Sequence, residues 1–189
     1  MANIAQDLDE RLNSSVPKYS VILQGDCWGN NIMFKLDKTE PVSAILIDYQ
    51  ISREDCPVLD LFYLLFNCSS YDTPSERLKQ WFDLYYSELG TCLHKFGLDV
   101  ATEYPRDKFH SDLKVHAKLG LAQRCMLATI LVREGNEVLD MQDASAFDFT
   151  DIEKAMETFS INKTADKTQN RLKKMIGGVI DNLLELGYL

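Results

Sequence analysis

The sequence lacks the features that mark membrane and secreted proteins. Its longest apolar run, Met126 to Val132, is far shorter than the roughly 20 residues that a membrane-spanning helix requires. The N-terminal residues MANIAQDLDE contain no apolar core of the length found in signal peptides. We therefore expect a soluble, cytoplasmic protein with no membrane partner.

The numbers and spacing of cysteine and basic residues also argue against disulfide-rich, zinc-binding and nucleic-acid-binding proteins. The five cysteines are odd in number, scattered, and without a C-x-x-C pair, so neither a disulfide scaffold nor a zinc site is indicated. The 20 lysines and arginines are outnumbered by 29 aspartates and glutamates, which gives a net charge of −9. Because nucleic acids and anionic membranes are bound through clustered positive charge, no nucleic-acid partner is expected.

Apolar residues make up 46% of the chain, enough for one folded domain with a substantial core. The hydrophobic pattern predicts short strands up to about residue 50 and helices after residue 60. The predicted fold class is therefore α+β and predominantly helical. The predicted helices cover residues 3–13, a buried segment after Asp60, a segment capped at Thr73-Pro74-Ser75-Glu76 that ends near Phe96, and residues 105–134, 150–159 and 169–186. The helix that ends near Phe96 is expected to turn five residues inward: Leu78, Trp81, Phe82, Leu84 and Tyr85.

The stretch from Tyr19 to Phe66 is the most informative part of the chain. Its first apolar run, Val21-Ile22-Leu23, predicts a short buried strand. Gln24-Gly25 then ends the strand and leads into a loop. Asp26 lies at the mouth of this loop, where a carboxylate is well placed for chemistry.

Two further apolar segments follow, residues 32–36 and 42–47, separated by a polar turn. They predict a β-hairpin. Asn31 lies where the hairpin opens and Asp48 where it closes, so both side chains can face the loop that carries Asp26. In phosphoryl transfer, one residue orients the attacking hydroxyl and oxygen ligands hold magnesium on the phosphates. An Asp, an Asn five positions later and an Asp after the next hairpin is the arrangement used by protein-kinase-type enzymes.

The segments LQGDCWGNNIMF and LIDYQISREDCPVLDLFYLLF resemble the ecdysteroid kinase-like family, also called CHK kinase-like. This family is a branch of the aminoglycoside phosphotransferase and choline kinase group. Its pattern is roughly His-Gly-Asp-x-Trp-x-Asn-Asn, a hydrophobic hairpin, Asp-Phe-Gln, Pro-x-x-Asp-Leu and a hydrophobic helix. The chain keeps Gly25, Asp26, Trp28, Asn30, Asn31, Asp48, Gln50, Pro57, Asp60 and Leu61.

The resemblance implies an ATP-dependent kinase that acts on a hydroxyl group of a small molecule, with a steroid-like acceptor as the leading interpretation. By this resemblance Asp26 is the catalytic residue, and Asn31 and Asp48 are the ligands of Mg²⁺. ATP would be the co-substrate. The alternative function is a non-catalytic helical remnant, or a binding module of a pseudokinase.

Three more residues are assigned by the resemblance to support of the catalytic loop. Asp60 would be buried and accept hydrogen bonds from backbone amides near the loop, Trp28 would pack the loop against the helices, and Gly25 belongs to the same motif. The chain departs from the family at Gln24, where His is usual, and at Tyr49, where Phe is usual. Replacing His by Gln removes an imidazole that helps to fix the loop in such kinases.

The resemblance extends over the whole chain but corresponds to only about the C-terminal half of a complete family member. No Gly-rich loop, strand Lys or five-stranded pattern precedes Gln24. We therefore expect residues 1–189 to form a single kinase-like C-terminal lobe with its N-terminal lobe absent. His94, His110 and His116 lack the i, i+4 spacing of a helical metal pair, so packing or surface roles are expected for them. The cluster of Trp81, Phe82, Tyr85 and Tyr86 predicts core packing or, alternatively, an acceptor pocket.

Overall fold

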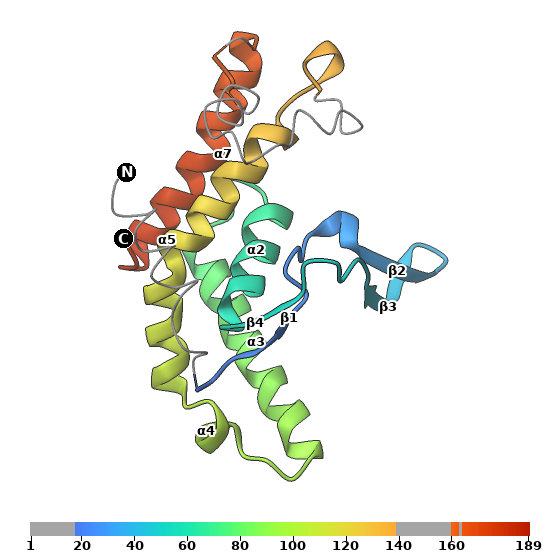
Figure 1. The fold of residues 1–189 in the computed structure, drawn as a ribbon, viewed down its shortest axis with the longest axis vertical. Coiled ribbons are helices and arrows are strands. Elements are labelled where there is room, and N and C mark those ends of the chain that lie inside the picture. Colours follow the sequence, from blue (N-terminus) through green and yellow to red (C-terminus); the bar gives the residue numbers. More distant parts are fainter. Residues whose placement is uncertain (1–17, 139–159, 163) are drawn as a thin grey trace.

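The computed structural model of the chain describes residues 18–138, 160–162 and 164–189. Within these ranges the fold is α+β and mostly helical, with five α-helices and two small antiparallel sheets of two strands each (Figure 1). The predicted fold class is confirmed at this level. The helices predicted at residues 3–13 and 150–159 lie outside the described residues.

The predicted hairpin is formed by β2 (Ile32–Asp37) and β3 (Glu40–Leu46), which pair in antiparallel register. The turn between them places Lys38 at a φ of 57°, a conformation that short hairpin turns require. A one-turn 3₁₀ helix, Gly29–Asn31, leads directly into β2. The hairpin projects away from the helices (Figure 1).

The first predicted strand, β1 (Val21–Leu23), forms but is mostly exposed. Within the described ranges it pairs only with β4 (Arg53–Asp55), and of its three residues only Leu23 is buried. The prediction of a buried strand was therefore wrong for Val21 and Ile22. Consecutive strand residues point to opposite faces of the sheet, and among the described residues only the end of β1 at Leu23 is covered. The polar sequence of β4 carries no strand pattern, so its pairing was not expected.

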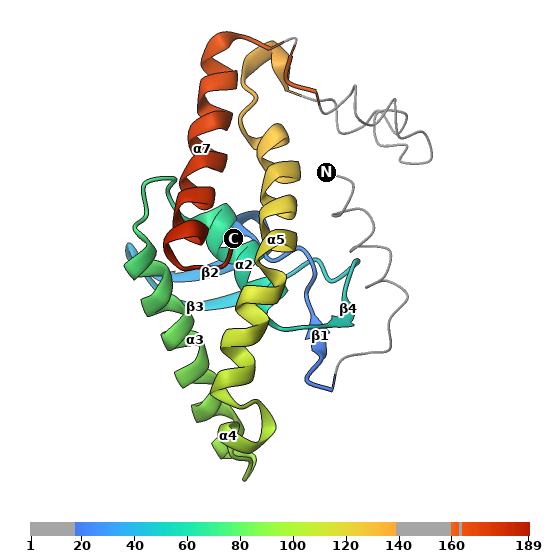
Figure 2. The ribbon, with the colours of Figure 1, turned by 90° about the vertical axis from the view of Figure 1, so that its left-hand side faces the viewer.

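The helices are α2 (Val58–Cys68), α3 (Ser75–Lys95), α4 (Val100–Glu103), α5 (Arg106–Leu131) and α7 (Asp166–Glu185). A second 3₁₀ turn, Gly135–Glu137, follows α5. Helix α7 runs alongside α5, and α2 packs between α5 and the strands (Figures 1 and 2). None of the described helices combines the length and apolar character needed to cross a membrane. Four of the five lie close to predicted positions, and the short α4 is the exception.

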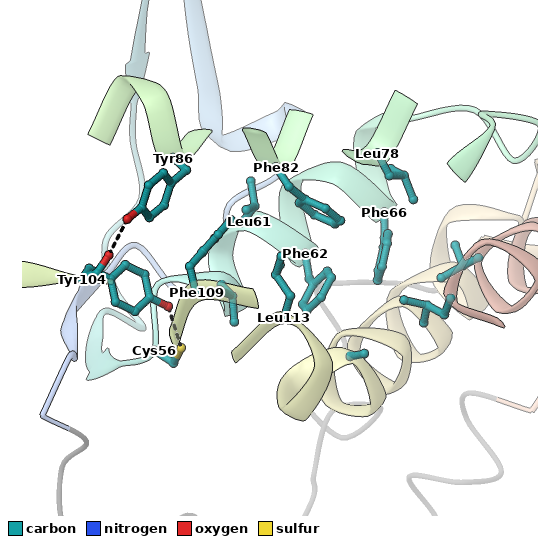
Figure 3. Close-up of a cluster of buried hydrophobic side chains, with 14 residues drawn as sticks. Cys56, Leu61, Phe62, Phe66, Leu78, Phe82, Tyr86, Tyr104, Phe109 and Leu113 are labelled. Atoms are coloured by element: carbon teal, nitrogen blue, oxygen red, sulfur yellow. Dashed lines mark hydrogen bonds between the residues drawn. The ribbon is translucent and has the colours of Figure 1, made fainter. Parts of the chain in front are cut away.

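The core lies where α2, α3 and α5 meet (Figure 3). Phe62 of α2 stacks on Phe66 with ring centroids 5.1 Å apart and meets the edge of Phe82 of α3 at 5.8 Å. Phe109 and Leu113 of α5 are fully buried beside them. Aromatic pairs at these separations add stabilisation beyond the area that they bury.

Gly120 allows α5 to approach α2 closely. A Cβ atom at this position would lie 2.9–3.1 Å from the Cβ and ring carbons of Phe62, which is closer than non-bonded carbons can approach without a shift. A glycine inside a helix costs about 1 kcal/mol relative to alanine. Phe62 packs against the backbone of α5 at Gly120, which explains why this helix contains a glycine despite its cost.

Two details of α3 differ from the prediction. The helix begins at Ser75, and the preceding Pro74 occupies the N-cap position with no side-chain hydrogen bond, so the predicted capping box does not form. Leu84, expected to face inward, is 56% exposed, whereas Tyr86 is buried. The inward face of α3 repeats at i, i+4 through Leu78, Phe82 and Tyr86, and Leu84 lies on the other side of the helix.

Candidate active site

The loop that follows β1 turns sharply at Gly25. This residue has a φ of 91°, and a Cβ atom here would lie 2.5 Å from the backbone oxygen of Ile51. Both the backbone conformation and the contact exclude any residue with a side chain. After this turn, Asp26 lies beside Tyr63 of α2.

The side chain of Asp60, in the first turn of α2, fixes this loop by binding two of the loop's backbone amides. Its Oδ2 accepts a hydrogen bond from the Gln24 amide at 2.7 Å, and its Oδ1 accepts one from the Gly25 amide at 3.1 Å. The expected hydrogen bonds are therefore present, although Asp60 is only partly buried, not fully buried as expected. Hydrogen bonds to a charged group are among the stronger ones in proteins, so this carboxylate anchors the loop to the helices.

The Gln24 side chain makes three hydrogen bonds that tie two loops together. Its Oε1 accepts from the Asp26 amide at 2.7 Å, and its Nε2 donates to the backbone oxygens of Ile47 and Asp48 at 2.9 and 2.8 Å. A neutral imidazole has only one donor and one acceptor. The Gln24 side chain therefore braces the loop through one accepted and two donated hydrogen bonds, one more than a neutral imidazole could make.

Asn31 is directly bonded to Asp26. Its Nδ2 donates to the backbone oxygen of Asp26 at 2.9 Å and to the carboxylate Oδ2 at 2.8 Å. The backbone oxygen of Asn31 accepts from the Ile47 amide at 2.9 Å, which connects the opening and the closing end of the hairpin. Among the described contacts no donor is bonded to Asn31 Oδ1, the atom that a cation would use.

Asp48 lies beside these residues but does not touch them with its side chain in any described contact. It is exposed, has a φ of 60° and is held through its backbone oxygen by Gln24. A positive φ is uncommon outside glycine and marks a constrained backbone. The backbone thus brings Asp48 to the same two loops as Asp26 and Asn31, and leaves its carboxylate without a described partner.

Tyr63 is a site residue that the sequence did not single out. It is buried on α2, and its pKa is raised well above its ordinary value, first by burial, then by the hydrogen bond that its hydroxyl donates to the Asp26 carboxylate, and then by the negative charge of Asp26. Tyr63 lies three positions after Asp60, so the two side chains share one face of the helix. This i, i+3 spacing after a motif Asp is the signal that could have identified it.

Trp28 and Cys27 contribute structure to the loop. The Trp28 amide donates to the Asp26 oxygen at 3.0 Å, and the Trp28 oxygen accepts from the Asn31 amide at 2.9 Å. Its indole nitrogen is buried without a hydrogen bond to any described residue, so the ring contributes through packing. Burial, followed by the charge of Asp60, raises the pKa of Cys27 to about 11, which keeps it a thiol at neutral pH.

The donor atoms of the site match a hard divalent cation. Asn31 and Asp48 supply an amide oxygen and a carboxylate, the ligand types that Mg²⁺ prefers, and neither atom is taken up by another described residue. Asp26, positioned by Asn31 and bordered by Tyr63, offers a carboxylate that could accept the proton of a hydroxyl group. These residues therefore fit both halves of the chemistry that phosphoryl transfer needs.

Comparison with known families agrees with this geometry. The model of the ecdysteroid kinase-like (EcKL) family matches residues 1–98, just over half of the chain. The chain belongs to the EcKL family. The matched segment contains every residue of the site, from Gln24 to Tyr63, and membership makes this a small-molecule kinase-like protein whose family uses ATP. Neither a curated protein nor a solved structure matches the chain significantly.

Proposed function

We propose that this EcKL chain carries the catalytic loop and the magnesium ligands of a cytoplasmic, ATP-dependent phosphotransferase that acts on a hydroxyl group of a small molecule. The observation that carries the proposal is the double hydrogen bond from Asn31 Nδ2 to Asp26, at 2.9 and 2.8 Å. It orients the proposed base and leaves the Asn31 amide oxygen without a hydrogen bond among the described contacts. An isolated pair of polar residues in a turn would not need this arrangement.

In this proposal Asp26 receives the acceptor hydroxyl and takes its proton as the acceptor oxygen attacks the γ-phosphorus of ATP, while the bond to the bridging oxygen breaks and ADP leaves. Asn31 and Asp48 would hold Mg²⁺, which would neutralise charge on the transferring phosphates. Tyr63 and Asn31 restrict the rotation of the Asp26 side chain. Gln24 and Asp60 keep the two loops in register, because correct positioning supplies most of the catalysis in this chemistry.

We propose a steroid-like alcohol as the acceptor, on the strength of the family to which the chain belongs. The aromatic cluster of α3 is a poor candidate for the acceptor pocket, since Phe82 and Tyr86 are buried in the core and Tyr86 donates to the Tyr104 oxygen at 2.9 Å. Trp81 and Tyr85 pack against the same core. These contacts favour the core-packing interpretation of the cluster.

We further propose that the chain is a kinase-like C-terminal lobe, and that much of the hold on the nucleotide comes from a second lobe. The phosphates of ATP are polyanionic, and the net charge of −9 repels them. The ligands Asn31 and Asp48 act only through the metal. We therefore expect the chain alone to bind Mg-ATP with a dissociation constant of roughly 1 mM, or about −4 kcal/mol, and to show no turnover.

Calorimetric titration of the chain with Mg-ATP tests the binding part. Asp48→Asn should abolish the heat of binding, because it removes the carboxylate ligand. Asp37→Asn, at the exposed end of β2, removes the same charge elsewhere and should leave binding unchanged. Micromolar affinity of the chain alone, or an equal loss in both variants, would contradict the proposal.

The transfer reaction is tested by placing the N-terminal lobe of an EcKL family member before Ala2. The fusion should bind Mg-ATP more tightly and phosphorylate a hydroxylated steroid. Asp26→Asn should then lower turnover by about 10²–10⁴-fold, the usual contribution of a general base, with little change in Mg-ATP affinity. A fusion that binds Mg-ATP tightly but transfers no phosphoryl group to any alcohol would favour the pseudokinase alternative.

A further inference from the structure

Three buried side chains outside the kinase site meet between the start of α2 and the middle of α5. Cys56 precedes α2, and Asp112 and His116 lie one turn apart on α5. The Cys56 sulfur, a carboxylate oxygen of Asp112 and a ring nitrogen of His116 all lie within 4.8 Å of one another. Their side chains are only 3%, 4% and 9% exposed, so the cluster is an interior feature.

We propose that Cys56, Asp112 and His116 bind a structural Zn²⁺ ion. A thiolate, an imidazole and a carboxylate are all ligands that zinc accepts, and zinc usually takes four donors. Mg²⁺ and Ca²⁺ prefer an all-oxygen shell, so this donor set selects against the metal of the kinase site. Three protein ligands leave one tetrahedral position for a further donor, and the Tyr104 hydroxyl borders the cluster, 4.0 Å from the Cys56 sulfur.

A purely structural ion pair accounts for only part of the cluster. Asp112 accepts a hydrogen bond from the Tyr104 hydroxyl at 2.9 Å and pairs with Lys108, which is sufficient to hold one buried carboxylate. It does not explain why a thiol and an imidazole converge on the same carboxylate. Two carboxylate oxygens offer about four lone-pair sites, so Asp112 can keep these partners and still bind a metal.

The cluster cannot act as a nucleophilic Cys–His–Asp triad either. A triad requires that a substrate carbonyl reach the sulfur. The Cys56 side chain is 3% exposed and packs in the hydrophobic core with Phe62 and Phe109 (Figure 3). A metal ion of small radius can occupy such a position, whereas an organic substrate cannot.

A metal here would act on the kinase site through α2. Cys56 lies four residues before Asp60, which holds the Gln24 and Gly25 amides. Linking Cys56 to two residues of α5 would fix the start of α2 against the longest described helix of the chain. The zinc would therefore set the position of Asp60 and, through it, of the catalytic loop, without touching the reacting groups.

Metal analysis of the full chain tests the proposal. After removal of metal with a chelator, the protein should take up one equivalent of Zn²⁺, and Co²⁺ in its place should show a thiolate-to-metal charge-transfer band. With free zinc about 100-fold above its dissociation constant, the melting temperature should rise by about 5–10 °C. Cys56→Ser and His116→Gln should each weaken zinc binding by more than about tenfold, the scale seen even for outer partners of metal ligands.

Matched controls separate this site from others. Cys27→Ser removes a second buried thiol, His110→Gln removes an exposed histidine of the same helix, and Asp48→Asn disables the proposed magnesium site. All three should retain one equivalent of zinc. Retention of zinc by both Cys56→Ser and His116→Gln would overturn the proposal, as would the absence of uptake by the wild-type chain. If the ligand variants do not fold, a cobalt complex of the wild type without a thiolate band would overturn it in their place.

Discussion

The helical half and the strand half of the molecule are each stabilised by a different kind of interaction. The helical half, α2, α3, α5 and α7, surrounds a core in which Phe62, Phe82 and Phe109 are essentially inaccessible. The strand half, β1 to β4 with the loops between them, leaves most of its apolar side chains exposed, including Met33 at 61% and Ile45 at 66%. Its order comes instead from polar contacts centred on Gln24 and Asp60.

This contrast separates stability from positioning. Burial of apolar area is non-directional and supplies most of the free energy of folding. Hydrogen bonds contribute less net energy but fix atoms to within tenths of an ångström. Asp26, Asn31 and Asp48 belong to the half that is positioned by hydrogen bonds. Helix α2, which carries Asp60 and Tyr63, joins that half to the core. Substitutions in the two halves should therefore have distinguishable effects.

The largest effect is expected from Phe62→Ala, at the centre of the helical half. It removes a ring that contacts Phe66, Phe82 and the backbone at Gly120. The free energy of unfolding should fall by about 3–5 kcal/mol, a large part of the 5–15 kcal/mol typical of a domain. Urea denaturation followed by circular dichroism measures it. Leu84→Ala, on the exposed face of α3, should change stability by no more than about 0.5 kcal/mol, and similar losses in both variants would refute the contrast.

An intermediate effect is expected from Asp60→Asn, at the junction of the two halves. The substitution keeps the size of the side chain but removes its charge and one of its two acceptor oxygens, so one backbone amide of Gln24 or Gly25 loses its partner. Because Asp60 is partly buried, the cost should be about 1–3 kcal/mol. Hydrogen exchange should accelerate at the Gln24 and Gly25 amides while the core amides of α5 change only with global stability. Uniform acceleration across both halves would show that Asp60 acts as a core residue.

The sequence predicts the parts of this architecture that depend on local pattern. The apolar periodicity places α2, α3, α5 and α7, and alternating segments around a polar turn place the β2–β3 hairpin. The motif spacing also anticipates that Asn31 approaches Asp26. These features arise within a few residues along the chain, so neighbouring side chains are sufficient to encode them.

Features that depend on contacts between distant segments could not be predicted. Strand β4 pairs with β1 through backbone groups, which leave no mark on its polar sequence. The three hydrogen bonds of the Gln24 side chain depend on where Ile47 and Asp48 lie in space. In the same way, Cys56 and Asp112 meet only because α2 packs against α5, and the scattered cysteines gave no sign of it.

A smaller effect, in opposite directions, is expected for two glycines of the helical half. Gly120→Ala gains helix propensity but forces a methyl group against Phe62, and overpacking typically costs about 1–3 kcal/mol, for a net loss of up to about 2 kcal/mol. At Gly177, in α7, an added Cβ atom would meet no atom of the described residues within 4 Å apart from the nearby backbone of α7 itself, so Gly177→Ala should gain up to about 1 kcal/mol. Thermal unfolding of the two variants compares them directly. A gain in both would mean that the α2–α5 contact is looser than its geometry indicates.

The smallest effect tests whether exposed polar contacts matter in the helical half as they do in the strand half. Glu137, in the 3₁₀ turn after α5, accepts hydrogen bonds from the Ala165 amide and the Thr168 hydroxyl, both at 2.6 Å. The backbone bond from Ala165 and then the bond from Thr168 lower the pKa of Glu137. A carboxyl group whose pKa is lower in the folded state stabilises the fold at pH values above its ordinary pKa of about 4.3. This stabilisation disappears as the pH falls through the pKa of the folded state.

Wild type should therefore have a slightly higher melting temperature than Glu137→Gln at neutral pH, and the difference should vanish on acidification. Glu88→Gln, on α3, controls for the loss of one charge, and a gap that persists or widens in acid would show that these hydrogen bonds do not favour the charged carboxylate.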